Sequence, residues 1–403
     1  MVITNLNYGG AQRVFYQLSL ELSKRYHVIE VVFNFEHGHA FKTGNPIYSL
    51  DVKGGGSLFR KVINFYLRYK RLADIKKETR ADVCISHLEG ADYVNISSRQ
   101  QERVICCIHG SKLSDKNIHG LSGWVRRKIL IPYLYKKADA LVAVSRGIKE
   151  EFLTQFGVRE TNIHWLPNFF YPDHITELAK GKLPSPWDKL LYDNRITILT
   201  AGRLSHQKNL KGLVRLAAHI KRYLAVKWVI LGDGELFSGL VSYAKQLNLM
   251  VFTIKDDKVD LLNGYDMYFL GYSENPFLWI SKADWFILTS DWEGFPMVIG
   301  ESMACGTPVI ATDCQTGPRE FLSDTAYPEV PVQTCLVEPY GILIPLLSEN
   351  LPEDVLESMT AQLKYLLTDK ALREKLAESS RQRIENFTPE RIMPGWFTLI
   401  ESD

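Results

Sequence analysis

Short apolar runs alternate with amphipathic stretches from the first residues of the chain. "VITNL" (2–6) reads as a buried strand, and in the next segment Val14, Leu18 and Leu22 recur at helical spacing. Further apolar runs end in polar or glycine turns; they are "HVIEVVFNF" (27–35), "ADVCISHLEG" (81–90), "RVICCIHG" (103–110) and "ADALVAVSRG" (138–147). Strands that alternate with helices predict parallel sheets covered on both faces.

The alternation stops near Pro167 and restarts at Arg195, and the segment between them holds several prolines. Such a segment is typical of an interdomain connection. Further strands are then expected within 195–203, 227–234, 283–290 and 307–313. We therefore predict an α/β chain of two tandem doubly wound, Rossmann-like domains facing a cleft, with ligands bound beyond the carboxyl ends of the strands. The predicted segments are a first domain 1–168, a linker 169–194, a second domain 195–385 and a C-terminal segment 386–403.

Length and composition fit this picture. A chain of 403 residues favours two domains, and 46% hydrophobic with 23% charged residues is typical of a globular protein in water. We expect a cytoplasmic protein, because the start does not read as a signal peptide and no uncharged apolar run approaches about 18 residues. The six cysteines form no C-x-x-C pair, which indicates buried free thiols rather than a metal site.

Charge is distributed unevenly between the two halves, although the formal net charge is only +2. Residues 1–170 carry 25 Lys/Arg against 15 Asp/Glu, and the remainder carries 23 against 31. The first half is therefore expected to meet something anionic: a membrane surface, a phosphorylated substrate or nucleic acid.

The stretch "DWEGFPMVIGESMACGTPVIATD" (291–313) places two carboxylates around a turn. Glu293 should lie in the loop after a strand, and Glu301 in a helix that begins near Pro296. Because helical side chains tilt toward the N-terminus, the Glu301 side chain can lean back toward that loop. Carboxylates accept hydrogen bonds from hydroxyls, and a helix N-terminus favours phosphate, so this pair suits a sugar joined to a nucleotide. In the alternative interpretation, Glu293 caps the helix and Glu301 is a solvated helix residue.

Two cations follow another strand of the same predicted domain. "AGRLSHQKN" (201–209) would place Arg203 and Lys208 at the carboxyl edge of the sheet, where a planar guanidinium and a point charge can bind phosphate. They could equally be surface charges before a helix.

Other strand ends carry weaker signals. Gly9 and Gly10 would let a ligand approach the start of a helix, but they do not form G-x-G-x-x-G. His109 ends a strand in a position typical of function. Ser145 lies outside a G-x-S-x-G elbow, which disfavours a hydrolase. No constellation of metal ligands emerges, so we expect neither a metal nor another cofactor.

Together these segments resemble glycosyltransferase family four, the retaining enzymes of GT-B fold. The residues that carry the resemblance are "YGGAQR" (8–13), "HG" (109–110), "AGRLSHQKN" (201–209), "LGDGE" (231–235), "FLGYSENP" (269–276) and "EGFPMVIGESMACGTPVIATDCQTGPREFL" (293–322). The resemblance implies a metal-independent hexosyl- or N-acetylhexosaminyl-type transferase whose donor is a nucleotide sugar, most commonly a UDP-sugar.

The resemblance also implies roles. Arg203 and Lys208 would hold the donor diphosphate, and Glu293 and His109 the transferred sugar. Other donor contacts would come from Gly9, Gly10, Gly202, Gly271, Tyr272, Phe295, Pro296, Met297 and Glu301. A donor phosphate oxygen would take the acceptor proton, so no protein base is needed. The tail 386–403 would form a helix that returns to the first domain.

The acceptor implied by the resemblance is a glycan or lipid-linked saccharide of bacterial surface-polysaccharide synthesis. Segments 58–77 and 121–137 mix cations with aromatic and aliphatic residues, as interfacial helices do, which predicts peripheral association with an anionic inner membrane face. Ordinary covering helices are the alternative.

Some features depart from the family pattern. Gln12 stands where an acid is common, and 250–268 and 324–340 are longer than usual. Two other functions fit the same fold: a sugar-nucleotide epimerase and a non-catalytic nucleotide-sugar-binding subunit. The basic excess lacks a recognised nucleic-acid-binding module, so no nucleic-acid partner is expected.

Overall fold

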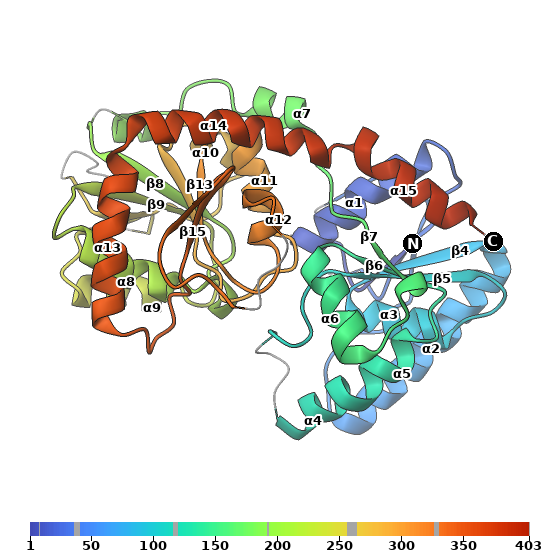
Figure 1. The fold of residues 1–403 in the computed structure, drawn as a ribbon. Coiled ribbons are helices and arrows are strands. Elements are labelled where there is room, and N and C mark those ends of the chain that lie inside the picture. The colour runs from blue at the N-terminus through green and yellow to red at the C-terminus, as the bar shows by residue number, and fades with distance from the viewer. Residues whose placement is uncertain are drawn as a thin grey trace. The chain divides into compact units, whose positions relative to one another are not determined.

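A computed structural model of the protein describes residues 1–7, 9–35, 41–115, 120–191, 193–255, 264–325 and 330–402. The chain forms two compact units (Figure 1). The first unit comprises Met1–Phe169 with Pro389–Asp403, and the second comprises Phe170–Thr388. Within the described part of the chain, no helix has the length and apolarity needed to cross a bilayer.

The first unit is built on a seven-stranded sheet in the order β3-β2-β1-β4-β5-β6-β7, and its strand pairings are parallel. Its strands are β1 (Val2–Ile3), β2 (Glu30–Val32), β3 (Ile47–Ser49), β4 (Val83–His87), β5 (Arg103–Ile108), β6 (Ala140–Ala143) and β7 (Ile163–Trp165). Its helices are α1 (Gly10–Ser23), α2 (Leu58–Thr79), α3 (Glu89–Ser97), α4 (Gly120–Val125), α5 (Ile131–Tyr135), α6 (Arg146–Phe156) and α15 (Pro389–Glu401), with a π-helical turn at Arg126–Leu130.

Both faces of this sheet are buried, as the near-continuous apolar strands predict. Val2 packs in a cluster with Leu72 of α2 and Val94 of α3, whereas the next residue, Ile3, packs with Phe15 of α1 on the opposite face. Figure 1 shows α2 and α3 on one side of the sheet and α1 on the other. This burial fixes the strand register and leaves the carboxyl edge to carry polar residues.

The second unit is built on an eight-stranded sheet in the order β10-β11-β9-β8-β12-β13-β15-β14. Its strands are β8 (Ile196–Ala201), β9 (Val226–Leu231), β10 (Val251–Thr253), β11 (Met267–Phe269), β12 (Trp285–Leu288), β13 (Val309–Thr312), β14 (Leu336–Glu338) and β15 (Gly341–Ile344). Its helices are α7 (Pro172–Leu178), α8 (Leu210–Ile220), α9 (Phe237–Gln246), α10 (Pro276–Ile280), α11 (Met297–Ala304), α12 (Pro318–Leu322), α13 (Glu353–Thr368) and α14 (Lys370–Ile384).

One strand of the second sheet departs from the predicted parallel pattern. β14 turns back through Pro339 and Tyr340 and pairs antiparallel with β15 at the sheet edge. It lies within the long stretch 324–340, of which residues 326–329 lie outside the described residues. The other long stretch, 250–268, contributes β10 and the start of β11, and its residues 256–263 are likewise outside the description.

The segment predicted as a linker, 169–194, does not stand apart from the domains: from Phe170 onward it is folded onto the second unit. Pro172 occupies the first turn of α7, where a proline begins a helix instead of breaking one. The hydroxyl of Thr176 then donates to the Ala304 carbonyl over 3.2 Å, which attaches α7 to α11. The prolines therefore mark helix starts and turns on the surface of a folded unit.

The chain terminus belongs to the first unit, where α15 occupies most of the tail 386–403. Trp396 of this helix is buried, and Glu401 forms an ion pair of 2.6 Å with Arg25 of the same unit.

We expect Gly300→Ala to lower the urea midpoint of unfolding of the second unit. A Cβ at this position of α11 would lie 2.3 Å from the ring of Phe170, and overpacking of this kind costs about 1–3 kcal/mol. The matched control is Gly239→Ala on α9, where a Cβ would meet no atom of the described residues within 4 Å and alanine should stabilise the helix by up to about 1 kcal/mol. Equal midpoints for Gly300→Ala and the parent protein would contradict this packing.

Candidate functional site

Glycines follow three strands of the second sheet and bring their backbones together. The Gly202 N–H donates to the Leu231 carbonyl over 3.0 Å, and the Gly232 N–H donates to the Gly271 carbonyl over 2.6 Å. A Cβ on Gly232 would lie 1.9 Å from the Gly202 carbonyl oxygen, so only glycine fits here. The carboxyl edge is therefore bare backbone at the ends of β8, β9 and β11, where a ligand can approach closely.

The two predicted cations lie on the loop that follows β8. Arg203 is 74% exposed and pairs with Glu235 over 3.1 Å. The pKa of Glu235 is lowered, chiefly because its carboxylate accepts a hydrogen bond from the Glu235 backbone N–H, and the Arg203 charge lowers it further. Lys208 closes a 3₁₀ turn at His206–Lys208, and its Nζ lies 2.6 Å from Oε1 of Glu293. The sequence places both Lys208 and Glu293 at this edge of the sheet, and in the structure they are in contact.

Glu293 is a buried residue with several polar partners, and its side chain is 7% exposed. The same Oε1 atom that meets Lys208 accepts a 2.6 Å hydrogen bond from the Ser290 hydroxyl. The Thr316 hydroxyl donates to the backbone carbonyl of Glu293, which fixes the loop itself. A buried carboxylate requires such partners, because its desolvation is otherwise unfavourable.

Asn209 connects the two loops that carry Lys208 and Glu293. It adopts a left-handed backbone with φ 46°, and its Oδ1 accepts from the Gly212 N–H over 3.1 Å to cap α8. Its Nδ2 donates to Asp291 over 2.7 Å and to the Leu347 carbonyl over 2.9 Å. Sequence reasoning missed Asn209, Ser290 and Thr316 as site residues; only Asn209, as an amide before a helix, carried a local signal.

The loop and helix after β12 have the predicted layout. Pro296 precedes α11, which begins at Met297, and Glu301 lies within that helix with only 7% exposure. The Phe295 ring points into an aromatic cluster, 4.3 Å from Phe321 between ring centroids, so its side chain serves packing. Tyr272 beyond β11 is 59% exposed.

In the first unit, Gly9 precedes α1 and Gly10 is its first residue. Gln12, which stands where the family commonly has an acid, donates through Nε2 to Asn5 Oδ1 over 3.2 Å. A Cβ on Gly10 would meet no atom of the described residues within 4 Å, so the start of the helix is open on that side.

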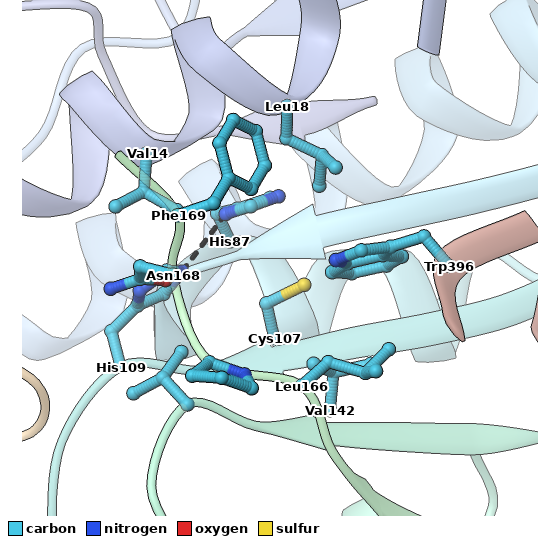
Figure 2. Close-up of a pocket in the computed structure, with 12 residues that line it drawn as sticks. Val14, Leu18, His87, Cys107, His109, Val142, Leu166, Asn168, Phe169 and Trp396 are labelled. Atoms are coloured by element: carbon cyan, nitrogen blue, oxygen red, sulfur yellow. Dashed lines mark hydrogen bonds between the residues drawn. The ribbon is translucent and has the colours of Figure 1, made fainter. Parts of the chain in front are cut away.

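His109 follows β5 at the edge of a pocket in the first unit (Figure 2). Its Nε2 lies 2.9 Å from Nδ1 of His87, which ends the neighbouring strand β4. Burial, with the nearby Lys112 charge adding to it, lowers the pKa of His109 to about 3, and burial lowers the pKa of His87 well below its usual value. Both imidazoles are therefore neutral near pH 7. Sequence reasoning missed His87 as well.

Other candidate groups have structural roles. The Ser145 hydroxyl accepts from the Ile148 N–H over 3.3 Å and caps α6. Cys84, Cys106, Cys107 and Cys314 are buried free thiols. The described ranges contain no group of three or more His, Cys, Asp or Glu residues arranged to hold a metal ion.

Comparison with known proteins gives two family matches that together span most of the chain. The Glycosyltransferase Family 4 model matches residues 8–174, and the model for Glycosyl transferases group 1 matches residues 184–340. An uncharacterized glycosyltransferase of Methanocaldococcus jannaschii is 27% identical over 354 residues, which cover 83% of this chain and 82% of that protein.

A second relative matches over a longer stretch. The N-acetylgalactosamine-N,N'-diacetylbacillosaminyl-diphospho-undecaprenol 4-alpha-N-acetylgalactosaminyltransferase of Campylobacter jejuni is 28% identical over 404 residues, covering 97% of this chain and 95% of that protein. Among solved structures, Anabaena Alr3699/HepE in complex with UDP and glucose superposes with a TM-score of 0.71 at 17% identity, covering 100% of this chain and 99% of that one. The chain belongs to glycosyltransferase family four and has the GT-B fold.

Proposed function

We propose that this glycosyltransferase moves a sugar from a UDP-sugar to a glycan or lipid-linked saccharide, with retention of anomeric configuration, in the synthesis of a bacterial surface polysaccharide. The observation that carries the proposal is the pairing of Lys208 with the buried Glu293, beside Arg203 and the bare glycine edge. Two cations and closely approachable backbone suit a diphosphate, and buried carboxylates suit sugar hydroxyls.

In the second unit, each predicted residue receives a role in this proposal. Lys208 and Arg203 hold the diphosphate, and Arg203 exchanges its exposed partner Glu235 for a phosphate oxygen. Glu293 accepts from the transferred sugar and Glu301 from the ribose. Supporting donor contacts come from Gly202, Gly271, Tyr272 and the backbone of Phe295, Pro296 and Met297.

The first unit supplies the remaining proposed contacts. Gly10 offers the open start of α1 to the diphosphate, and Gly9 contacts it when the Gln12 side chain that lies against Gly9 moves aside. His109 contacts the transferred sugar near the reacting carbon. Its neutral imidazole can do so as a hydrogen-bonding group without competing for the diphosphate charge.

The proposed chemistry relies on leaving-group stabilisation. The bond between the anomeric carbon and the diphosphate oxygen breaks, and the acceptor oxygen bonds to the same face of that carbon. The acceptor proton passes to a donor phosphate oxygen, so no side chain acts as a general base. Arg203 and Lys208 stabilise the charge that develops on the diphosphate, which is usually the largest protein contribution to such a step.

The relatives support the finer details of the proposal. UDP is named for the HepE structure, and a diphospho-undecaprenol saccharide is named for the Campylobacter relative. The latter name also specifies an alpha linkage. No observation favours the epimerase or the non-catalytic subunit as a second candidate.

Lys208→Ala should reduce kcat/KM for transfer. A hydrogen bond to a charged group contributes about 1.5–3 kcal/mol, so the loss should be about 10- to 150-fold. Lys245→Ala, which removes an exposed lysine of α9, is the matched control and should keep the parent rate. Near-normal turnover by Lys208→Ala would refute its phosphate role.

A thermal-shift panel of nucleotide sugars should identify the donor. The melting temperature should rise with one UDP-sugar, because a ligand that binds only the folded state stabilises it. The same donor should give a much smaller shift with Glu301→Ala, which removes the proposed ribose contact. An undiminished shift with that variant would contradict the role of Glu301.

We further propose that the first unit rests on an anionic membrane surface through the apolar stripe of α2. Phe59, Val62, Ile63 and Tyr66 recur at helical spacing and are 76%, 62%, 38% and 57% exposed. Exposed cations accompany them at Arg60 and Lys61. Trp124, Ile129 and Tyr133 are also exposed, in the segment α4–α5. Such an arrangement of apolar and basic groups is typical of helices that lie in a membrane interface.

The protein should sediment with vesicles that contain anionic lipid, and less so as salt is raised, because the cationic contribution is screened. Phe59→Ser with Tyr66→Ser should weaken this binding. The control is Tyr365→Ser, which removes a 70% exposed aromatic residue from the second unit. Failure to bind at any salt concentration would dismiss the membrane proposal and leave the transferase proposal intact.

A further inference from the structure

We infer that His87 is a positioning residue for the transfer reaction: it fixes the tautomer of His109, so that His109 presents an Nδ1–H donor to an oxygen of the transferred sugar. This inference rests on the proposed function for the contact between His109 and the sugar. The arrangement of the two rings is a property of the first unit alone.

The two histidines lie at the ends of adjacent parallel strands. His87 pairs in register with Cys107, two residues before His109. The His87 Nδ1 and His109 Nε2 atoms are 2.9 Å apart, and the ring centroids are 5.0 Å apart with 27° between the ring planes. Figure 2 shows this hydrogen bond as a dashed line. His87 is 1% exposed and is further held by the ring of Phe15, which meets it edge-on at 5.2 Å.

Two neutral imidazoles can share this hydrogen bond in only two ways. Either His87 Nδ1 donates its proton to His109 Nε2, or His109 Nε2 donates to His87 Nδ1. In the first arrangement His87 Nε2 carries a lone pair, and in the second it carries a proton. The far side of the His87 ring therefore decides the tautomer of His109.

On that far side, the described residues offer no acceptor for a proton. His87 Nε2 is buried, and within the described ranges no hydrogen-bond partner reaches it. The pocket that His87 lines is mostly apolar, and its other members include Val14, Leu18, Cys107, Val142 and Trp396 (Figure 2). A buried N–H without an acceptor is rarer and more costly than an acceptor without a donor.

The proton of His87 is therefore on Nδ1, and His109 Nε2 accepts it. Because His109 is neutral, its own proton must then reside on Nδ1. His109 is partly exposed, so this N–H can serve a ligand at the rim of the pocket. His87 acts only through His109, because it is itself buried.

Two substitutions of His87 separate positioning from packing. The side-chain amide of His87→Asn places an N–H donor near the position of Nδ1, whereas His87→Leu fills similar space without a donor. Long-range ¹⁵N–¹H NMR of histidine-labelled protein reports the tautomers, and His109→Asn identifies the signals of His109.

We expect the Nδ1–H tautomer of His109 in the parent protein and in His87→Asn, and population of the Nε2–H tautomer in His87→Leu. Transfer by His87→Leu should fall about three- to tenfold, the size of one neutral hydrogen bond, and His87→Asn should restore most of it. A parent His109 with its proton on Nε2, or a His87→Asn variant as defective as His87→Leu, would overturn the inference. Absence of transfer in the parent protein with every donor would instead refute the proposed function, while the NMR spectra still test the role of His87.

Discussion

The ion pair between Lys208 and Glu293 is the interaction on which the second unit's edge depends. It joins the loop after β8 to the loop after β12, two strands that pair directly in the sheet. The buried carboxylate is tolerable because Lys208 and Ser290 both serve the same oxygen. The pair thereby places a cation and an acceptor side by side where several strands end, before any ligand arrives.

The residues around this ion pair hold its two loops in place and leave the backbone at the strand ends uncovered. Glycines at the ends of β8 and β9 touch and carry no side chain over the edge. The loop that bears Glu293 is anchored through Phe295, which packs 5.6 Å from Phe387 between ring centroids. The Phe170 N–H donates to the Phe387 carbonyl over 2.7 Å. Because the second unit begins at Phe170 and ends at Thr388, this bond joins its two chain ends next to Phe295. Apolar packing thus supports a polar site.

The sequence predicted the fold well because hydrophobic periodicity is local: strand and helix alternate within a few residues of each other. It also placed Glu293 in a loop and Glu301 in a helix, from Pro296 and the glycine turn that follows. It missed His87 and the connection made by Asn209, because those roles arise from contacts with residues far along the chain. It also missed Ser290, which bonds Glu293 only three residues further on, because a serine at a strand end carries no specific signal. The folded segment after Phe170 was missed for the same reason as His87, because docking of a short helix is set by tertiary contacts. The antiparallel β14 pairs with the adjacent β15 and was missed because a strand of three residues is too short to show a hydrophobic period. The roles assigned to the site residues stay predictions.

The central claim is that this edge holds a nucleoside diphosphate as the leaving group of a sugar transfer. The most direct test measures nucleoside diphosphate release from the donor with and without a saccharide acceptor, together with the anomeric configuration of the product by NMR. The account predicts release that requires acceptor, matches product in amount and gives a product with the donor's anomeric configuration. Release from the donor alone with an epimerised sugar, or a product of inverted configuration, would contradict it.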